Sequence, residues 1–129
     1  LAEPADLVIV NLGSNDMLRG LDPNLAYENL KQIMDKLEAK NMSTLLIGHL
    51  GPLNYGAEYK ADYDGAFKKL AASYEMVFYP FFFKMLMAAD GVTPNLQLYF
   101  QPDGMHPNAE GVQAVVSDMG PYVLRALQQ

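Results

Sequence analysis

The chain has 129 residues, of which 50% are apolar and only 19% are charged, and its formal net charge is −6. This composition is that of one globular domain with a real core, and it excludes a disordered chain. The few basic residues are scattered along the sequence, so nucleic acid and anionic membranes are poor candidate partners. No apolar run approaches the roughly 18 residues of a membrane-spanning helix. The sequence contains no Cys, which excludes disulfides, thiolate nucleophiles and Cys metal sites.

The first half of the chain predicts a strand, a helix and a second strand. Residues 7–12 form a short, largely β-branched run without polar alternation, which is typical of a central parallel strand. An Asp-Pro pair followed by apolar residues at helical spacing predicts a helix over residues 23–40. Residues 44–48 predict a second buried strand. The loop that follows, residues 49–56, contains Pro, Asn and Gly and should be irregular.

The second half continues the alternation. Aromatic residues at helical spacing predict a helix over residues 57–74, and residues 76–79 predict a short strand. The very apolar residues 81–87 are too few to span a membrane and predict a short buried helix. Residues 90–101 show few periodic cues and are expected to form a loop. A last helix should begin near Ala109 and present one apolar face made of Val112, Val115, Val116, Met119, Val123 and Leu127.

This order of elements predicts the fold class. Strands that alternate with helices form a parallel sheet with helices on both faces, joined by right-handed crossovers. We therefore expect residues 1–129 to be one α/β domain, a three-layer α/β/α sandwich. Ligands of such sheets bind beyond the carboxyl ends of the strands, so polar residues at those ends are the first candidates for a functional site.

The stretch Asp103-Gly104-Met105-His106-Pro107 places a carboxylate and an imidazole three residues apart in a turn. Such a turn can fold the Asp103 carboxylate onto one ring nitrogen of His106, which leaves the other nitrogen free to act as a general base. An ordinary Asp-Gly turn with a histidine before a helix has the same pattern. Both interpretations remain open on this motif alone.

A second motif, Gly13-Ser14-Asn15-Asp16, follows the first predicted strand. At a strand end, the Asn15 amide could point into the crevice that the Asp103 turn also faces, where an N–H group can stabilise an oxyanion. These residue types also favour a plain turn before a helix. His49, at the end of the second predicted strand, is expected to be a structural residue rather than a second base or a metal ligand.

Together the two motifs resemble the GxND and DxxHP blocks of the SGNH (GDSL) hydrolases, in the right order and at the right separation. Their surroundings resemble the bacterial thioesterase I, lysophospholipase L1 and arylesterase branch. The similar segments are Met17-Leu18-Arg19-Gly20, Asn54-Tyr55-Gly56 and Pro80-Phe81-Phe82. The resemblance implies the flavodoxin-like SGNH fold and hydrolysis of carboxylic esters or thioesters through a Ser-His-Asp mechanism. It implies no cofactor and no metal, and it suggests a periplasmic or secreted protein.

The resemblance also implies roles for individual residues. His106 is similar to the general base, Asp103 to the acid that orients it, and Asn15 to the oxyanion-hole asparagine. Asp16 would brace its loop. Residues 17–22 resemble a mobile loop that borders the acyl site, and residues 51–53 stand where the family lines its acyl groove. The substrate-contacting residues implied for a small acyl ester or thioester are Gly13, Met17, Leu18, Gly51, Pro52 and Leu53.

One departure from the family pattern is the nucleophile. The Gly-Asp-Ser block that carries the catalytic serine has no counterpart, and Ser14 stands at the variable position of the GxND block. The chain thus resembles the C-terminal part of the enzyme without its N-terminal strands. We expect the isolated chain to be inactive, with an open strand edge that favours self-association or pairing with the missing segment. The alternative is an inactive α/β fragment that binds an acyl group or a partner.

Overall fold

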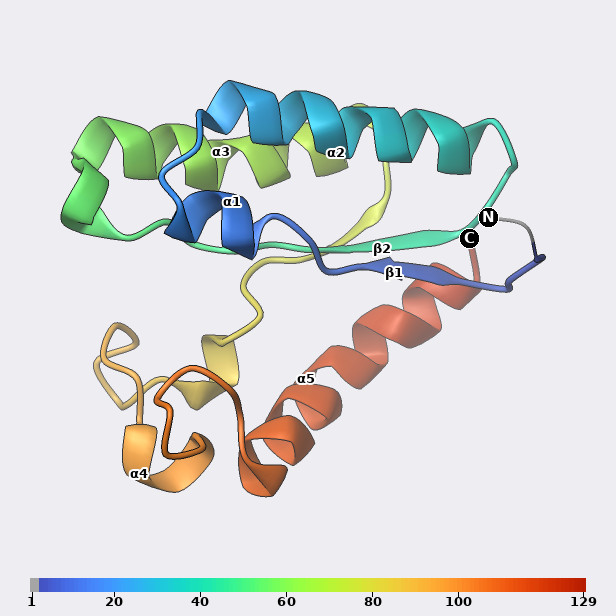
Figure 1. The fold of residues 1–129 in the computed structure, drawn as a ribbon. Coiled ribbons are helices and arrows are strands. Elements are labelled where there is room, and N and C mark those ends of the chain that lie inside the picture. The colour runs from blue at the N-terminus through green and yellow to red at the C-terminus, as the bar shows by residue number, and fades with distance from the viewer. Residues whose placement is uncertain (1–2) are drawn as a thin grey trace.

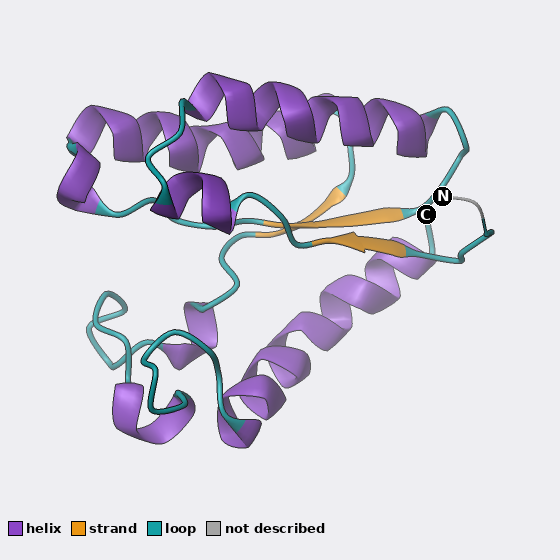
Figure 2. Ribbon diagram, viewed as in Figure 1, coloured by secondary structure: helices purple, strands orange, loops and turns teal. Residues whose placement is uncertain are grey.

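The computed structural model of the protein describes residues 3–129. A parallel sheet in the order β1-β2-β3 lies between helices on both of its faces (Figures 1 and 2). The α/β/α sandwich expected from the sequence is confirmed. The strands are β1 (Val8–Val10), β2 (Thr44–Ile47) and β3 (Val77–Tyr79). The helices are α1 (Ser14–Leu18), α2 (Pro23–Glu38), α3 (Ala57–Ser73), α4 (Leu96–Tyr99) and α5 (Ala109–Leu127), with short 3₁₀ helices η1 (Leu53–Tyr55) and η2 (Lys84–Leu86).

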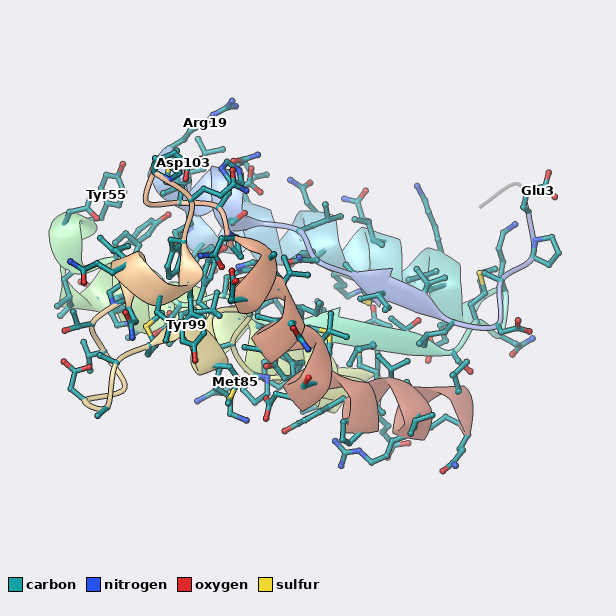
Figure 3. All side chains as sticks on the ribbon, turned by 90° about the horizontal axis from the view of Figure 1, so that it is seen from below. Glu3, Arg19, Tyr55, Met85, Tyr99 and Asp103 are labelled. Atoms are coloured by element: carbon teal, nitrogen blue, oxygen red, sulfur yellow. The ribbon has the colours of Figure 1, made fainter. Side chains whose placement is uncertain are left out.

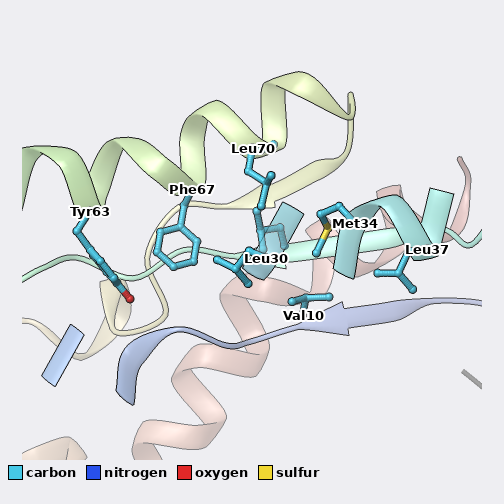
Figure 4. Close-up of a cluster of buried hydrophobic side chains, with 9 residues drawn as sticks. Val10, Leu30, Met34, Leu37, Tyr63, Phe67 and Leu70 are labelled. Atoms are coloured by element: carbon cyan, nitrogen blue, oxygen red, sulfur yellow. The ribbon is translucent and has the colours of Figure 1, made fainter. Parts of the chain in front are cut away.

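Helices α2 and α3 cover one face of the sheet. The Asp22 carboxylate accepts a hydrogen bond from the Asn24 N–H (2.9 Å), so α2 begins with the expected cap and with Pro23 in its first turn. Side chains from the two helices converge on the strands (Figure 4). The buried residues of this layer are Val10, Leu30, Met34, Leu37, Leu46, Tyr63, Phe67, Leu70 and Ala71.

Helix α5 covers the opposite face. Successive side chains of a strand point to opposite faces, so Leu45 and Ile47 of β2 pack on the α5 side while Leu46 packs on the other. All of β2 is buried, as expected for the central strand. The buried residues of this second layer are Leu45, Ile47, Tyr79, Leu86, Phe100, Val115, Met119 and Ala126.

The predicted apolar face of the last helix is partly wrong. Val115 and Met119 are buried and Val123 packs against the same cluster. Val112 and Val116, however, are 51% and 62% exposed, and Leu127 is also exposed. Helix α5 therefore turns its buried face toward β2 and β3 and leaves an apolar flank in solvent.

Two shorter predictions also need correction. Residues 90–101, expected to be a loop, contain the one-turn helix α4, which begins at an Asn95 cap whose Oδ1 accepts from the Leu98 N–H (3.3 Å). In residues 81–87, only Lys84–Leu86 is helical, as a 3₁₀ turn, and only Leu86 is buried. The conformation of both segments depends on a local side-chain cap or on the packing of a single residue, and neither of these produces a periodic pattern in the sequence.

The carboxyl ends of the strands gather the candidate residues at one end of the molecule. Helix α1 and the turn around Asp103 lie at that end, whereas the start of β1 and the C-terminus lie at the other (Figure 1). Figure 3 likewise places Arg19, Tyr55 and Asp103 opposite Glu3. Within residues 3–129, no helix is long and apolar enough to cross a membrane.

Candidate active site

The Asp103 turn has the geometry that the sequence predicted. His106 Nδ1 lies 2.6 Å from Asp103 Oδ2, while Asp103 Oδ1 accepts from the backbone N–H groups of Met105 (2.9 Å) and His106 (3.0 Å). The backbone hydrogen bond from His106, followed by the side-chain bond, lowers the pKa of Asp103 to about 2. An ionised carboxylate only accepts hydrogen bonds, so Nδ1 carries the ring proton and Nε2 is left with its lone pair. The His106 side chain is 69% exposed, so Nε2 is accessible.

The turn is held by the elements on either side of it. An antiparallel bridge joins Phe100 to Pro107, and the Gln101 amide donates to the Pro107 carbonyl (3.0 Å). Asn108 caps α5 by accepting from the Gly111 N–H (2.9 Å), and its own amide donates to the Leu98 carbonyl (2.9 Å). These contacts join the turn that carries Asp103 and His106 to α4 and to the start of α5, and so they hold the turn in place.

Asn15 lies in the first turn of α1, a short helix that the sequence did not predict. Gly13 precedes it with φ of 106°, a left-handed conformation that favours glycine. A Cβ on Gly13 would also lie 3.2 Å from the Phe67 ring, so the chain passes directly over α3. The Gly13 carbonyl accepts from the Tyr63 hydroxyl at 2.7 Å. The Asn15 side chain is exposed at this strand end.

His49 is buried at the end of β2, as the structural interpretation predicted. Its Nε2 lies 2.8 Å from Asn11 Oδ1, and its ring packs against Phe67 and Phe82. Burial lowers the pKa of His49 from 6.5 to about 4, so the ring is neutral at pH 7 and donates from Nε2 to Asn11. His49 therefore braces the segment between β1 and Asn15.

The two halves of the candidate site, the Asn15 segment and the Asp103 turn, lie at the same end of the sheet (Figure 1). Among the described residues, no hydrogen bond joins Asn15 to Asp103 or His106. Figure 1 shows α1 near the level of the strands and the Asp103 turn below it, next to α5. An open pocket of about 330 Å³ adjoins Asn15 and is lined by residues 11–16 and by part of α2. This pocket does not include Asp103 or His106 in its lining.

The remaining candidate residues divide into two groups. Met17 packs against the α2/α3 core, whereas Leu18 beside it is exposed. Gly51 is buried and donates its N–H to Asp64 Oδ1 (2.6 Å). Its neighbours Pro52, which is half-buried, and Leu53, at the start of η1, point outward near the same end of the sheet.

Sequence reasoning missed the aromatic row that supports α1. Tyr55, Tyr59 and Tyr63 recur every four residues, and each hydroxyl donates to a backbone carbonyl of residues 13–21. The spacing of Tyr59 and Tyr63 contributed to the predicted helix over residues 57–74, and Tyr55 fell in the loop before it. A helical period does not show which hydroxyl contacts which carbonyl. Residues 3–129 also contain no group of three or more His, Asp or Glu side chains arranged to hold a metal ion.

Comparison with known proteins identifies the family. The model of the GDSL-like lipase/acylhydrolase family matches residues 1–114. The chain belongs to this family. It is 33% identical over 111 residues to thioesterase 1/protease 1/lysophospholipase L1 of Escherichia coli K12, a match that covers 86% of the chain and 50% of that protein. It is 32% identical to esterase TesA of Pseudomonas aeruginosa, covering 81% of the chain and 49% of the relative. The chain thus spans about half the length of these relatives.

Solved structures agree with this assignment. The crystal structure of TesA matches 94% of the chain and 63% of its own length, with a TM-score of 0.79 at 28% identity. The SGNH-hydrolase family esterase AlinE4 matches 98% of the chain and 64% of its own length, with a TM-score of 0.69 at 37% identity. The sheet and its helices therefore follow the SGNH-hydrolase fold, and the resemblance drawn from the two short motifs is confirmed.

Proposed function

We propose that the protein is part of a serine esterase or thioesterase of the arylesterase, acyl-thioesterase or lysophospholipase type. The observation that carries this proposal is the Asp103 and His106 pair, whose 2.6 Å contact fixes the imidazole tautomer with Nε2 facing solvent. Asn15 at the same end of the sheet supports it. Relatives named as thioesterase, lysophospholipase, esterase and arylesterase narrow the reaction to acyl transfer to water.

In the proposed mechanism, His106 Nε2 removes the proton of a serine hydroxyl as the serine oxygen bonds to the acyl carbon. The carbonyl oxygen becomes an oxyanion, which the Asn15 amide stabilises. When the tetrahedral intermediate collapses, His106 returns the proton to the departing alkoxide or thiolate. The same nitrogen then takes a proton from water as the water oxygen attacks the acyl-serine. When this second intermediate collapses, His106 returns the proton to the serine oxygen and the acid leaves. Asp103 remains ionised throughout and stabilises the imidazolium.

The serine of this mechanism would come from a segment outside residues 1–129. The open edge of β1 supports this proposal, because within the described residues β1 pairs only with β2. On α5, Asp118 contacts Tyr79 of β3, so Val112 and Val116 lie on the flank turned away from β3, on the β1 side. An added strand beside β1 would cover this flank and reach the crevice next to Asn15.

The activity test uses an intact form of the protein that includes a Gly-Asp-Ser segment. It should hydrolyse p-nitrophenyl butyrate, and His106→Ala should abolish turnover. Asp103→Asn should lower it about 10⁴-fold, as expected when an imidazole loses the carboxylate that fixes its tautomer. The isolated 129-residue chain should be inactive. An active H106A variant of the intact form would contradict the assignment of the base.

A matched control exists within the chain. Asp90-Gly91-Val92-Thr93 forms the same kind of turn, in which Asp90 Oδ1 accepts from the backbone N–H groups of Val92 and Thr93 and Oδ2 from the Thr93 hydroxyl. Asp90→Asn should therefore loosen a turn of the same geometry without changing turnover. If Asp90→Asn and Asp103→Asn lowered turnover equally, both turns would matter only for folding.

The pairing proposal has its own measurement. An open strand edge favours association, so light scattering should show the isolated chain forming dimers or larger species as concentration rises. Ile9→Lys places a charge on this edge strand and should keep the chain monomeric. Val92→Lys is the control: it adds the same charge at an exposed position in a distant turn, and it should leave the association unchanged. A chain that stays monomeric at every concentration would count against the open edge.

The second candidate is a non-catalytic module that binds an acyl group or a partner. The pocket beside Asn15 and the apolar flank of α5 are the features that favour it. If the intact gene product contains no serine near Asn15 and His106 and hydrolyses no ester, this second function replaces the first.

A further inference from the structure

Residues 100–108 repeat the structure of residues 87–95. Each copy ends in Asp-Gly-x-x-Pro-Asn, and the final Asn caps the helix that follows, α5 in one copy and α4 in the other. In each copy the first residue forms an antiparallel bridge to the proline. The two glycines have nearly the same φ, 70° for Gly91 and 67° for Gly104. The chain therefore contains the same turn twice.

The hydrogen bonds inside the two copies also correspond. In each copy, one Asp oxygen accepts from two backbone N–H groups. The other oxygen contacts the side chain at the fourth position, which is Thr93 in one copy and His106 in the other. The Ala88 N–H donates to the Thr93 carbonyl (2.7 Å), as the Gln101 N–H does to the His106 carbonyl (2.8 Å). Differences between the copies therefore lie in the remaining side chains.

Only one of the copies has a glutamine amide. Gln101 donates from its Nε2 to the Pro107 carbonyl (3.0 Å), while its backbone N–H holds the His106 carbonyl. Ala88 occupies the corresponding position of the other copy and has no side-chain donor. Gln101 therefore holds the end of the Asp103 turn through both its backbone and its side chain.

The capping asparagines differ in the same way. Both accept from a backbone N–H three residues later, Asn95 from Leu98 (3.3 Å) and Asn108 from Gly111 (2.9 Å). The Asn108 amide also donates to the Leu98 carbonyl (2.9 Å). Among the described residues, the Asn95 amide has no such partner. Asn108 thus joins the start of α5 to α4, whereas Asn95 only caps α4.

These additional bonds are in the copy where accuracy of position matters. The His106 side chain is 69% exposed, so packing does not hold it in place. Its contacts with Asp103 lie within the turn and fix the imidazole only relative to that turn. A general base must lie within hydrogen-bond reach of the hydroxyl that it deprotonates, and a displacement of about 1 Å can lower the rate about 10²-fold. Bonds that lead out of the turn must supply this accuracy.

We propose that Gln101 and Asn108 are positioning residues, whose side-chain amides hold the Asp103 turn against α4 and α5 and so set where His106 Nε2 lies. The inference rests on the proposed esterase function. Backbone hydrogen bonds common to both copies form the turn, and the two amides orient it. No printed contact joins either amide to the imidazole, so their loss should leave the bond between Asp103 and His106 intact.

Amide hydrogen exchange of the 129-residue chain tests this role without any need for activity. Gln101→Met removes the amide at nearly constant size, and Asn108→Ser removes it but keeps a helix cap. The backbone N–H groups of residues 101 and 108 bond across the turn and report its opening. After correction for intrinsic rates, each variant should speed their exchange about 2- to 10-fold, the effect of one net hydrogen bond.

Matched controls make the same substitutions where the amide has no partner. Gln97→Met changes an exposed glutamine of α4 whose amide, among the described residues, makes no hydrogen bond. Asn95→Ser changes the capping asparagine of the other copy. Neither control should alter exchange at residues 101 and 108. Unchanged exchange in both test variants, or equal acceleration in the controls, would overturn the proposal.

Kinetics of an intact form that includes the serine separate positioning from folding. Gln101→Met and Asn108→Ser should each lower kcat for p-nitrophenyl butyrate about 3- to 10-fold with KM unchanged, because a displaced base weakens only the transition state. The two controls should change neither constant. Long-range ¹H–¹⁵N NMR should still find the His106 proton on Nδ1 in both test variants, since the Asp103 contact remains.

The two readouts distinguish the ways in which the proposal can fail. Faster exchange with an unchanged kcat would mean that the amides only stabilise the turn, and it would overturn the positioning role. If Asn108→Ser does not fold, Gln101→Met decides the question alone. An intact protein without esterase activity would refute the proposed function, whereas the exchange rates would still show whether the two amides hold the turn.

Discussion

His49 should make the free energy of unfolding depend on pH between about 4 and 6.5. Its pKa in the folded protein is about 4 because the ring is buried, compared with 6.5 for a solvated histidine. Above pH 6.5 the ring is neutral whether or not the chain is folded. As the pH falls, only the unfolded chain takes up the proton, so stability is lost until the folded ring also titrates near pH 4.

The size of the effect follows from the two pKa values. At 1.36 kcal/mol per pH unit, the interval from 6.5 to 4 corresponds to about 3 kcal/mol. This is a large share of the 5–15 kcal/mol that stabilises a typical domain. Carboxylates with lowered pKa values, such as Asp103 at about 2, lose their contribution only at lower pH and mainly affect the range below 4.

Urea unfolding at a series of pH values measures this effect, with tyrosine fluorescence as the probe because the chain has no Trp. His49→Gln keeps an amide donor for Asn11 but cannot titrate, so it removes His49's contribution alone. The wild type should lose about 3 kcal/mol more than this variant between pH 6.5 and 4. NMR gives a direct check, since only two histidines are present. Parallel curves for the two proteins, or a His49 resonance that titrates near 6.5, would refute the reasoning.

Three substitutions test other parts of the structure. Gly111→Ala should lower the free energy of unfolding, measured in urea, by about 1–3 kcal/mol, because a Cβ there would lie 2.3 Å from a backbone carbonyl oxygen of α4. Gly120→Ala on the same helix is the control: its Cβ would point into open space, so the change should leave the free energy of unfolding unchanged or raise it. Asp118→Ala should lower the free energy of unfolding by about 1–3 kcal/mol, because it leaves the buried Tyr79 hydroxyl without its 2.8 Å hydrogen-bond partner. The same substitution should have a smaller effect in a Tyr79→Phe variant, which would show that the two side chains are coupled. Asn15→Ala in the intact enzyme should lower kcat about 10²- to 10³-fold, the effect of one oxyanion donor; unchanged turnover would remove Asn15 from the mechanism.

The family follows from residues that are close in sequence. The contacts between Asp103 and His106 close within four residues, and the Asp90 turn shows that Asp-Gly followed by a suitable side chain forms the same structure elsewhere in the chain. What distinguishes the candidate site is the imidazole at the fourth position. Local chemistry of this kind can be predicted from sequence because no distant residue takes part in it.

The alternation of strands and helices could also be predicted from the sequence. Apolar runs of four to six residues and helical spacing of large side chains determined the parallel sheet and the order of its layers. Predicted strands were too long by one to three residues, since pairing with a neighbour, which sequence does not show, decides where a strand ends.

Only the tertiary structure decided which predicted features face one another. The Tyr63 hydroxyl reaches the Gly13 carbonyl across 50 residues of sequence, and His49 reaches Asn11 across 38. These contacts depend on how α3 and β2 pack against β1, and a periodic pattern is the same whichever partner it meets. For the same reason, the sequence placed Val112 and Val116 on the apolar face of the last helix, whereas in the structure both side chains are exposed to solvent.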